Sequence, residues 1–283
     1  DLHLSIRRQR QMCIRDRCMS NDGIVFVERL YGLATVVLNR PEKLNALNKE
    51  MWSRLGQIFI DLDKDETVRC IVLRGAGEKA LGPGADIKEF ELERANSSKA
   101  SEYGKLMHKA MAAIAECRHP VIARIQGLCV GGALELAAVC DLRIASDNSR
   151  FGIPVNRLGL VMSHYEMAGL IELVGKSITL EILFEGRIFN AEEAYKKGLV
   201  NKVVLEKDLD LELRSMVERI CAGAPLVNRW HKLFAQRIVR GLSTGGKLSE
   251  YEVLEGFECF DTCDFQEGYK AFLEKREPKF SGK

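Results

Sequence analysis

The alternation of short apolar runs with longer amphipathic stretches constrains the fold of this chain more than any other feature. The segments "VRCIVLRG" (68–75), "PVIARIQG" (120–127) and "LRIAS" (142–146) are short and rich in aliphatic residues, which predicts buried strands. Helical patterns at 98–116 and in "GGALELAAVCD" (131–141) lie between them. Strands that alternate with helices predict βαβ units, and therefore an α/β fold with a mostly parallel sheet.

Turn and capping residues mark both ends of this pattern. The segment "GIVFVERLYGLATVVLNRP" (23–41) predicts two strands around a turn at Tyr31 and Gly32. Asn48 is the expected N-cap of the amphipathic helix that follows. "NAEEAYKKGLVNKVV" (190–204) predicts a capped helix that returns to a last strand.

The sequence divides into three predicted parts. After about residue 206 only helical patterns remain, so we expect a sheet-based core over 19–205 and a helical lobe over 206–283. The leader at 1–18 shows no periodicity, and its arginines are typical of a mitochondrial transit peptide. Its segment "RRQRQMCIRDR", however, closely resembles a translated sequencing adapter. We therefore expect a non-native leader and a natural start at Met19.

Charge, hydropathy and cysteine content narrow the class of protein. Residues 1–18 hold five of the 42 basic residues and two of the 40 acidic ones, so residues 19–283 carry a formal net charge of −1. That balance gives no support to nucleic-acid binding. No apolar run approaches the roughly 18–20 residues of a membrane span. Nine scattered cysteines without a CxxC pair indicate reduced thiols and no metal site. We expect a soluble, cytoplasmic protein without a metal or bound cofactor.

Two glycine-rich segments carry the chemistry that we predict. "LGPGADIKEF" (81–90) and "CVGGALELAA" (129–138) each follow a predicted strand, and each is expected to open a helix. The first amides of a helix lack internal partners, and glycine lets a ligand approach them. Two such amides, one from each loop, form an oxyanion hole if they converge on one carbonyl oxygen. Glu135, in the first turn after the second segment, would then lie where it can move a proton.

Each of these segments is equally open to a structural interpretation. Paired glycines often allow a helix to pack closely on a strand. Glu135 also suits the first turn of a helix, where the helix dipole stabilises a negative charge. Taken alone, neither segment decides between structure and function.

Considered together, six ordered segments carry a resemblance to a known family. The chain resembles the crotonase family, also called enoyl-CoA hydratases/isomerases, over nearly all of residues 22–283. The matching segments are "LNRPEKLNALN" (38–48), "GAGEKALGPGADIKEF" (75–90), "HPVIARIQGLCVGGALELAAVCDLRIAS" (119–146), "FGIP" (151–154), "EAYKKGLVNKVV" (193–204) and "FDTCDFQEGYKAFLEKREPKF" (260–280). The resemblance implies a crotonase-like ββα spiral of two stacked sheets, with a C-terminal helical lobe that forms trimers.

The resemblance also implies a coenzyme A thioester substrate and roles for individual residues. The amides of Ala85 and Gly132 would form the oxyanion hole, with Glu135 as a catalytic acid/base. Coenzyme A enters as part of the substrate, so no separate cofactor is implied. We expect an acyl-CoA partner and a homotrimer or dimer of trimers. The implied CoA contacts are Lys43, Leu44, Ala46, Gly84, Asp86, Ile87 and Lys88, of which the two lysines are equally open to being solvated surface charges.

One departure from the family pattern leaves the reaction open. Hydratases of the family have a second glutamate directly after the "FGxP" motif, and this chain has Val155 there. Glu135 alone suits double-bond isomerisation, in which a single base moves one proton between two carbons. Hydration needs a relay through Glu135 or a substitute acid/base, for which the candidates are His164, Tyr165, Glu166 and Asn156. Decarboxylation of a malonyl-type thioester and an inert acyl-CoA-binding homologue are the remaining alternatives.

Overall fold

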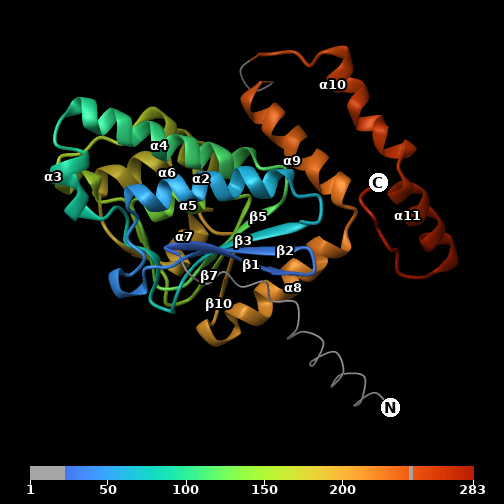
Figure 1. Cartoon of the computed structure of the whole chain (residues 1–283), viewed down its shortest axis with the longest axis horizontal. Coiled ribbons are helices and arrows are strands. Elements are labelled where there is room, and N and C mark those ends of the chain that lie inside the picture. The colour runs from blue at the N-terminus through green and yellow to red at the C-terminus, as the bar shows by residue number, and fades with distance from the viewer. Residues whose placement is uncertain (1–22, 242–244) are drawn as a thin grey trace.

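The strands form two sheets in the computed structural model, which describes residues 23–241 and 245–283 (Figure 1). The larger sheet contains, in spatial order, β1 (Val25–Leu30), β2 (Leu33–Leu38), β3 (Cys70–Gly75), β5 (Val121–Ile125), β7 (Leu142–Ser146) and β10 (Lys202–Val204). The smaller sheet contains β4 (Ala80–Gly82), β6 (Leu128–Val130), β8 (Arg150–Gly152) and β9 (Phe189–Asn190). The predicted α/β fold with two sheets is confirmed.

The predicted hairpin and the mostly parallel pairing are both present. β1 and β2 pair antiparallel around Tyr31 and Gly32, whose positive φ angles close the turn. The other neighbouring pairs of the larger sheet run parallel. Because parallel strands need a crossover, the chain leaves and re-enters this sheet through helices and through strands of the smaller sheet.

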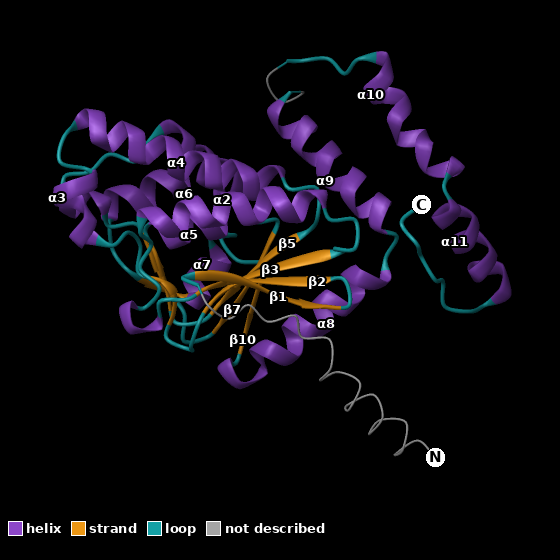
Figure 2. Cartoon of the chain, viewed as in Figure 1, coloured by secondary structure: helices purple, strands orange, loops and turns teal. Residues whose placement is uncertain are grey.

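Helices cover both faces of the larger sheet, as Figures 1 and 2 show. α2 (Lys49–Lys64) and α4 (Ser97–Glu116) lie side by side over one face, where Ile71 and Leu73 of β3 join the main core. α8 (Leu209–Ala222) packs on the other face, against Cys70 and Val72. Successive residues of β3 therefore serve opposite cores, as the two-residue period of a strand requires.

Asparagine caps start two helices where the sequence predicts them. The Asn48 side chain accepts a hydrogen bond from the Met51 amide at 2.9 Å, at the start of α2. The Asn190 side chain does the same for the Glu193 amide at 2.9 Å and starts α7 (Ala191–Lys196). Both predictions are confirmed.

The segment after the first glycine cluster differs from the prediction. No α-helix starts at Gly84 or Ala85; a 3-10 turn (Ile87–Glu89) and the single turn of α3 (Phe90–Glu93) follow instead. The second cluster does open a helix, α5 (Gly132–Ala138), which packs against α6 (His164–Glu185). The physical reason for the difference is that Ala85 pairs as extended backbone with Leu47.

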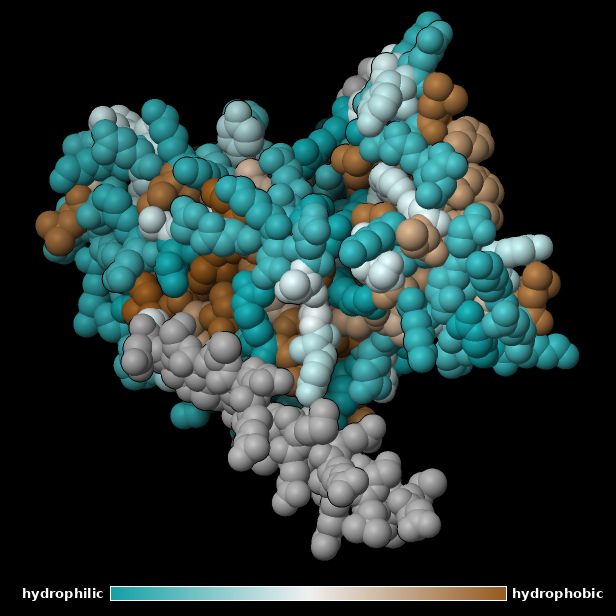
Figure 3. Space-filling model, turned by 45° about the vertical axis from the view of Figure 1, so that its right-hand side comes forward, coloured by the Kyte–Doolittle hydropathy of each residue, from teal (hydrophilic) through white to brown (hydrophobic). Residues whose placement is uncertain are grey.

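After β10, the regular elements of the described residues are all helices. α9 (Pro225–Arg240), α10 (Glu250–Leu254) and α11 (Cys263–Glu274) follow α8, and α10 and α11 stand away from the body on the right of Figure 1. Many apolar side chains of this part are exposed, and Figure 3 shows them as brown patches on the lobe. The division into core and lobe stays a prediction.

Two further expectations concern the ends and the environment of the chain. Within the described residues, no helix is long and apolar enough to cross a membrane. The cytoplasmic location stays a prediction. The predicted leader over 1–18 and the start at Met19 lie outside the described residues.

Candidate active site

Two neighbouring strands of the smaller sheet bring the glycine clusters together. β4 and β6 pair in parallel, so the segments that follow their carboxyl ends start at the same edge of the sheet. Gly84 has a φ of 108°, and a Cβ placed on it would lie 3.2 Å from the Val130 carbonyl oxygen and 3.6 Å from the Gly132 nitrogen. Gly84 and Gly131 therefore let the two backbones approach each other closely.

Within the part of the chain that the structure describes, the amides of Ala85 and Gly132 both lack a hydrogen-bond acceptor. The Leu47 amide donates to the Gly84 carbonyl and the Asp86 amide donates to the Leu47 carbonyl, each at 2.8 Å, so the Ala85 amide between them points away from Leu47. Gly132 is the first residue of α5, where an amide has no intrahelical acceptor. Among the hydrogen bonds of the described residues, neither amide donates one.

Glu135 lies one turn into α5 with its side chain buried in the protein. The residue is 5% exposed, and its carboxyl makes no hydrogen bond with the described residues. Burial raises the pKa of Glu135 to about 8; the negative charge of Glu166 adds to this effect and the positive charge of Arg94 opposes it. Glu135 is therefore mostly protonated at neutral pH. Its pKa lies close enough to neutral pH for the carboxyl to release or take up a proton during a reaction.

Glu166 is held at the start of α6 by its own helix cap and by α4. Its Oε2 accepts a hydrogen bond from the Ser163 amide at 2.7 Å, and its Oε1 lies 3.3 Å from His108 Nε2. His108 Nε2 also lies 2.9 Å from Ser163 Oγ. The Glu166 side chain is only 13% exposed. The cap and the histidine together fix a carboxylate whose charge reaches Glu135.

The other candidate substitutes for the second acid are placed differently. His164 is exposed, and Tyr165 is 75% exposed with its ring against the ring of His108 at a centroid distance of 5.0 Å. Asn156 donates a hydrogen bond to the Phe184 carbonyl at 2.9 Å, which braces the chain near Gly186. Val155 packs against the main core. Of the four candidates, Glu166 is the one whose charge contributes to the raised pKa of Glu135.

The segment from Arg40 to Ala46, which carries three of the predicted CoA contacts, is fixed by buried polar groups. Arg40 pairs with Asp86 at 2.8 Å, and Lys43 pairs with the same carboxylate at 3.3 Å. The Arg40 guanidinium holds the pKa of Asp86 below its usual range. Asn45 is fully buried and donates to the carbonyls of Ala76 and Ala80 at 3.0 and 2.9 Å. These bonds tie the segment to the loop that carries Ala85.

The remaining predicted CoA contacts lie along the same segment and the loop after Ala85. Leu44 has a left-handed backbone at the end of a 3-10 turn, and Ala46 is 8% exposed. Ile87 and Lys88 are exposed beside the buried Asp86. The bridge between Leu47 and Ala85 brings the two segments together, with Ile87 and Lys88 exposed and Ala46 buried.

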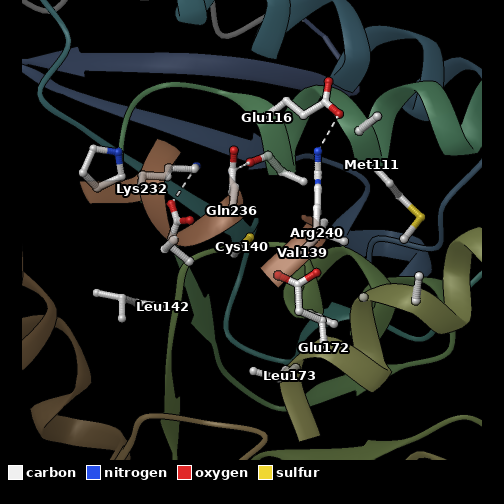
Figure 4. A pocket seen from close by; sticks show the side chains of 18 of the residues that line it. Met111, Glu116, Val139, Cys140, Leu142, Glu172, Leu173, Lys232, Gln236 and Arg240 are labelled. Atoms are coloured by element: carbon white, nitrogen blue, oxygen red, sulfur yellow. Dashed lines mark hydrogen bonds and ion pairs between the residues drawn. The ribbon is translucent and has the colours of Figure 1, made fainter. Parts of the chain in front are cut away.

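A large cavity lies away from the two free amides. It has a volume of about 920 Å³ and lies between α9 and the helices α4 and α6 (Figure 4). Lys232 pairs with Asp141 at 2.8 Å at one end, and Arg240 pairs with Glu116 at 3.2 Å at the other. His108 and Tyr165 line the cavity, but Ala85, Gly132 and Glu135 do not. The cavity therefore meets the site at the Glu166 cluster and not at the amides.

Sequence reasoning missed two residues of this site. Arg94 acts on Glu135 through its charge, and His108 holds Glu166. Neither residue lies in a recognisable motif. Each reaches the site through tertiary packing, Arg94 from the end of α3 and His108 from α4. Within the described residues, no group of three histidine, cysteine or acidic side chains is placed to hold a metal ion.

Comparisons with known proteins show relatives over nearly the whole chain. Residues 28–283 match the family model described as enoyl-CoA hydratase/isomerase. The chain is 35% identical to the short-chain-enoyl-CoA hydratase of Clostridium acetobutylicum over 89% of this chain and 95% of the relative. It is 34% identical to the crotonyl-CoA hydratase of Syntrophomonas wolfei over 92% and 98%, respectively.

A solved structure shows the same fold. An enoyl-CoA hydratase/carnithine racemase from Magnetospirillum magneticum superposes with a TM-score of 0.90 and 42% identity, over 96% of this chain and all of that one. The matches extend over the sheets, the glycine clusters and the C-terminal helices. The chain therefore belongs to the enoyl-CoA hydratase/isomerase family.

Proposed function

We propose that this protein is an acyl-CoA enzyme that forms an enolate of its thioester substrate at Ala85, Gly132 and Glu135. The observation that carries the proposal is the pair of free amides beside a buried carboxyl group. Two amides that converge on a thioester oxygen stabilise the negative charge that develops there, and removal of one such donor typically costs 10²–10³ in rate. A protonated Glu135 beside them delivers a proton to the carbon next to the carbonyl.

Glu166 is the second carboxylate in the proposed hydration. It takes a proton from water while the water oxygen bonds to the β-carbon of the enoyl group. The electron pair of the double bond moves into the enolate, which then takes the Glu135 proton at the α-carbon. One water molecule is added in total, and the proton on Glu166 returns to Glu135 through solvent. The position of Glu166 beside Glu135 supports this role, because Val155 cannot transfer a proton.

Coenzyme A is proposed to bind along the segment next to Gly84. Lys43 and Lys88 would contact its phosphates, and Leu44, Ala46, Asp86 and Ile87 would line its path. Asp86 is already paired with Arg40 and Lys43, which supports a role in shaping this path more than a direct contact. We expect a trimer or a dimer of trimers, since many apolar residues of the C-terminal lobe are exposed.

Double-bond isomerisation is the second candidate, and Val155 favours it. With an apolar residue where a hydratase has its second glutamate, Glu135 would remove a proton from one carbon and return it to another. The two reactions are separated by supplying 2-enoyl-CoA and 3-enoyl-CoA of equal chain length. Hydration of the first requires Glu166 in our account, whereas isomerisation of the second does not.

The test of the proposed function is turnover by the wild type and by Glu135→Gln, which keeps the shape of the side chain but removes its acid. We expect Glu135→Gln to lower kcat by about 10²–10⁴ for hydration of crotonyl-CoA. His164→Gln, at an exposed position of α6, is the matched control and should keep wild-type turnover. Full turnover by Glu135→Gln on every thioester the protein processes would refute the proposal. Binding of thioesters without turnover by the wild type would identify an inert homologue.

A further inference from the structure

Arg94 is a half-buried cation at the end of α3, and no acidic side chain of the described residues forms an ion pair with it. The centre of its guanidinium lies 4.0 Å from the centroid of the Tyr103 ring and 4.8 Å from that of the Phe90 ring. Among the described residues it forms no ion pair. Two aromatic rings hold the planar group in one orientation; one of its donors reaches the Tyr103 hydroxyl, and the others remain available to an anion.

The acidic residues next to Arg94 in the sequence are already engaged elsewhere. Glu93 pairs with the Lys49 ammonium at 2.6 Å, and Glu89 accepts a hydrogen bond from the Lys49 amide at 2.8 Å. Glu89 therefore caps the start of α2, and Glu93 forms an ion pair there. The stretch "EFELERAN" supplies acidic groups around Arg94, yet the fold directs two of them to another cation.

Two observations relate Arg94 to the proposed site. Its charge acts on Glu135, which is buried in α5. Tyr103, under the guanidinium, is buried, and the Trp52 side chain lies beside its hydroxyl. The edge of the Trp52 ring in turn lies 3.4 Å from where a Cβ of Gly132 would be. Buried aromatic side chains thus connect Arg94 to the amide that we propose as part of the oxyanion hole.

We propose that Arg94 binds a carboxylate carried by the acyl group of the substrate, so that the preferred substrates are CoA monothioesters of dicarboxylic acids. A guanidinium binds a carboxylate through two parallel hydrogen bonds. The rings beneath the Arg94 guanidinium already restrict its orientation, which lowers the entropy cost of binding. The inference rests on the proposed function in taking a CoA thioester as the ligand. It adds the class of acyl group.

The phosphates of CoA are the other anions that a thioester substrate offers. They lie at the far end of the pantetheine arm from the carbonyl, whereas Arg94 acts on the residue beside the carbonyl. Lys43 and Lys88 are the cations at the proposed CoA segment. The path from Arg94 through Tyr103 and Trp52 to Gly132 therefore points to the acyl half of the substrate.

A bound carboxylate would also change the state of Glu135. The positive charge of Arg94 lowers the pKa of Glu135, and an anion on Arg94 cancels this effect. Glu135 then keeps its proton to a higher pH while a dicarboxylic substrate is bound. The substrate thus helps to prepare the acid that protonates its own α-carbon.

The test is calorimetric binding of saturated thioesters, which requires no turnover. Glutaryl-CoA and pentanoyl-CoA have five-carbon acyl chains and differ only in the terminal carboxylate; malonyl-, succinyl- and adipyl-CoA with their methyl-ended counterparts extend the series. We expect the wild type to bind at least one dicarboxylic member about tenfold or more tighter than its counterpart. Arg94→Met should reduce this preference to near one, and Arg94→Lys should restore part of it.

Arg54→Met replaces an exposed arginine of α2 and is the matched control, which should keep the wild-type preference. Equal binding of every pair by the wild type would overturn the inference, as would a preference that Arg94→Met leaves unchanged. Neither result would affect the proposed enolate chemistry, which turnover tests separately. Absence of binding for all thioesters would overturn both proposals.

Discussion

At the scale of single residues, the proton affinity of Glu135 depends on its surroundings. Burial raises the pKa of its carboxyl to about 8, Glu166 raises it further by its charge, and Arg94 lowers it. A carboxyl with this pKa is mostly protonated at neutral pH and becomes a base in mildly alkaline solution. The same group can therefore act as the acid in hydration and as the base in proton abstraction.

This pKa makes the stability of the protein depend on pH. Between the ordinary pKa of 4.5 and about 8, folded Glu135 keeps a proton that the unfolded chain has lost, so the free energy of unfolding falls as the pH rises. The loss amounts to at most about 1.4 kcal/mol per pH unit and ends near pH 8. Glu135→Gln cannot ionise at this position. The free energy of unfolding of the variant, relative to that of the wild type, should therefore increase as the pH rises over this range. Urea unfolding at fixed protein concentration measures the difference, and parallel curves would contradict it.

A second prediction at this scale concerns Glu166. Glu166→Gln keeps the helix cap but loses the base, so we expect hydration of 2-enoyl-CoA to slow by about 10²-fold or more. Isomerisation of 3-enoyl-CoA should change far less. Tyr165→Phe, one residue earlier in α6 and exposed, is the matched control. Equal losses in both reactions would show that Glu166 supports the fold of the site and does not act on water.

At the scale of elements, the strands and capped helices could be predicted from sequence, but not the contacts between them. Strand periodicity and the caps at Asn48 and Asn190 are local signals, and the structure has both. Local signals could not predict the conformation of Ala85, because its pairing with Leu47 is a tertiary contact. The same holds for Arg94, which comes next to Glu135 only through the packing of α3 and α4.

Asn45 provides the prediction at the element scale. Its buried side chain joins β3 and β4 to the segment before α2, and its backbone has a left-handed φ of 64°. Asn45→Ala removes partners from two carbonyls and should lower the free energy of unfolding by about 3 kcal/mol. Asn48→Ala loses only a helix cap and should cost about 1 kcal/mol. Urea unfolding compares the two variants, and an equal or smaller loss for Asn45→Ala would contradict this account.

At the scale of the whole molecule, the C-terminal lobe exposes more apolar surface than a free monomer favours. Phe257, Phe260, Tyr269 and Phe272 are 53–83% exposed, and Phe272 is the most exposed of them. A second copy of the chain is the expected cover, as in a trimer. The helical pattern after residue 206 could predict helices here, but the exposed face appears only once the lobe is placed in space.

The oligomeric state tests this expectation. Phe272→Glu places a charge in the predicted interface and should shift the protein from trimer to monomer, as measured by light scattering after size-exclusion chromatography. Tyr31→Glu, at the exposed turn between β1 and β2, is the matched control and should leave the mass unchanged. A monomeric wild type, or a Phe272→Glu variant of unchanged mass, would show that the lobe is not an interface.

The most direct test of the central claim is the loss of deuterium from α-deuterated butyryl-CoA into water. This saturated thioester can neither add water nor isomerise, so exchange reports formation of the enolate alone. We predict exchange that the wild type catalyses, that increases with pH and levels off above about pH 8 as Glu135 ionises, and that Glu135→Gln abolishes. Bound thioester without exchange, or exchange that survives in Glu135→Gln, would contradict an enolate-forming site at Glu135.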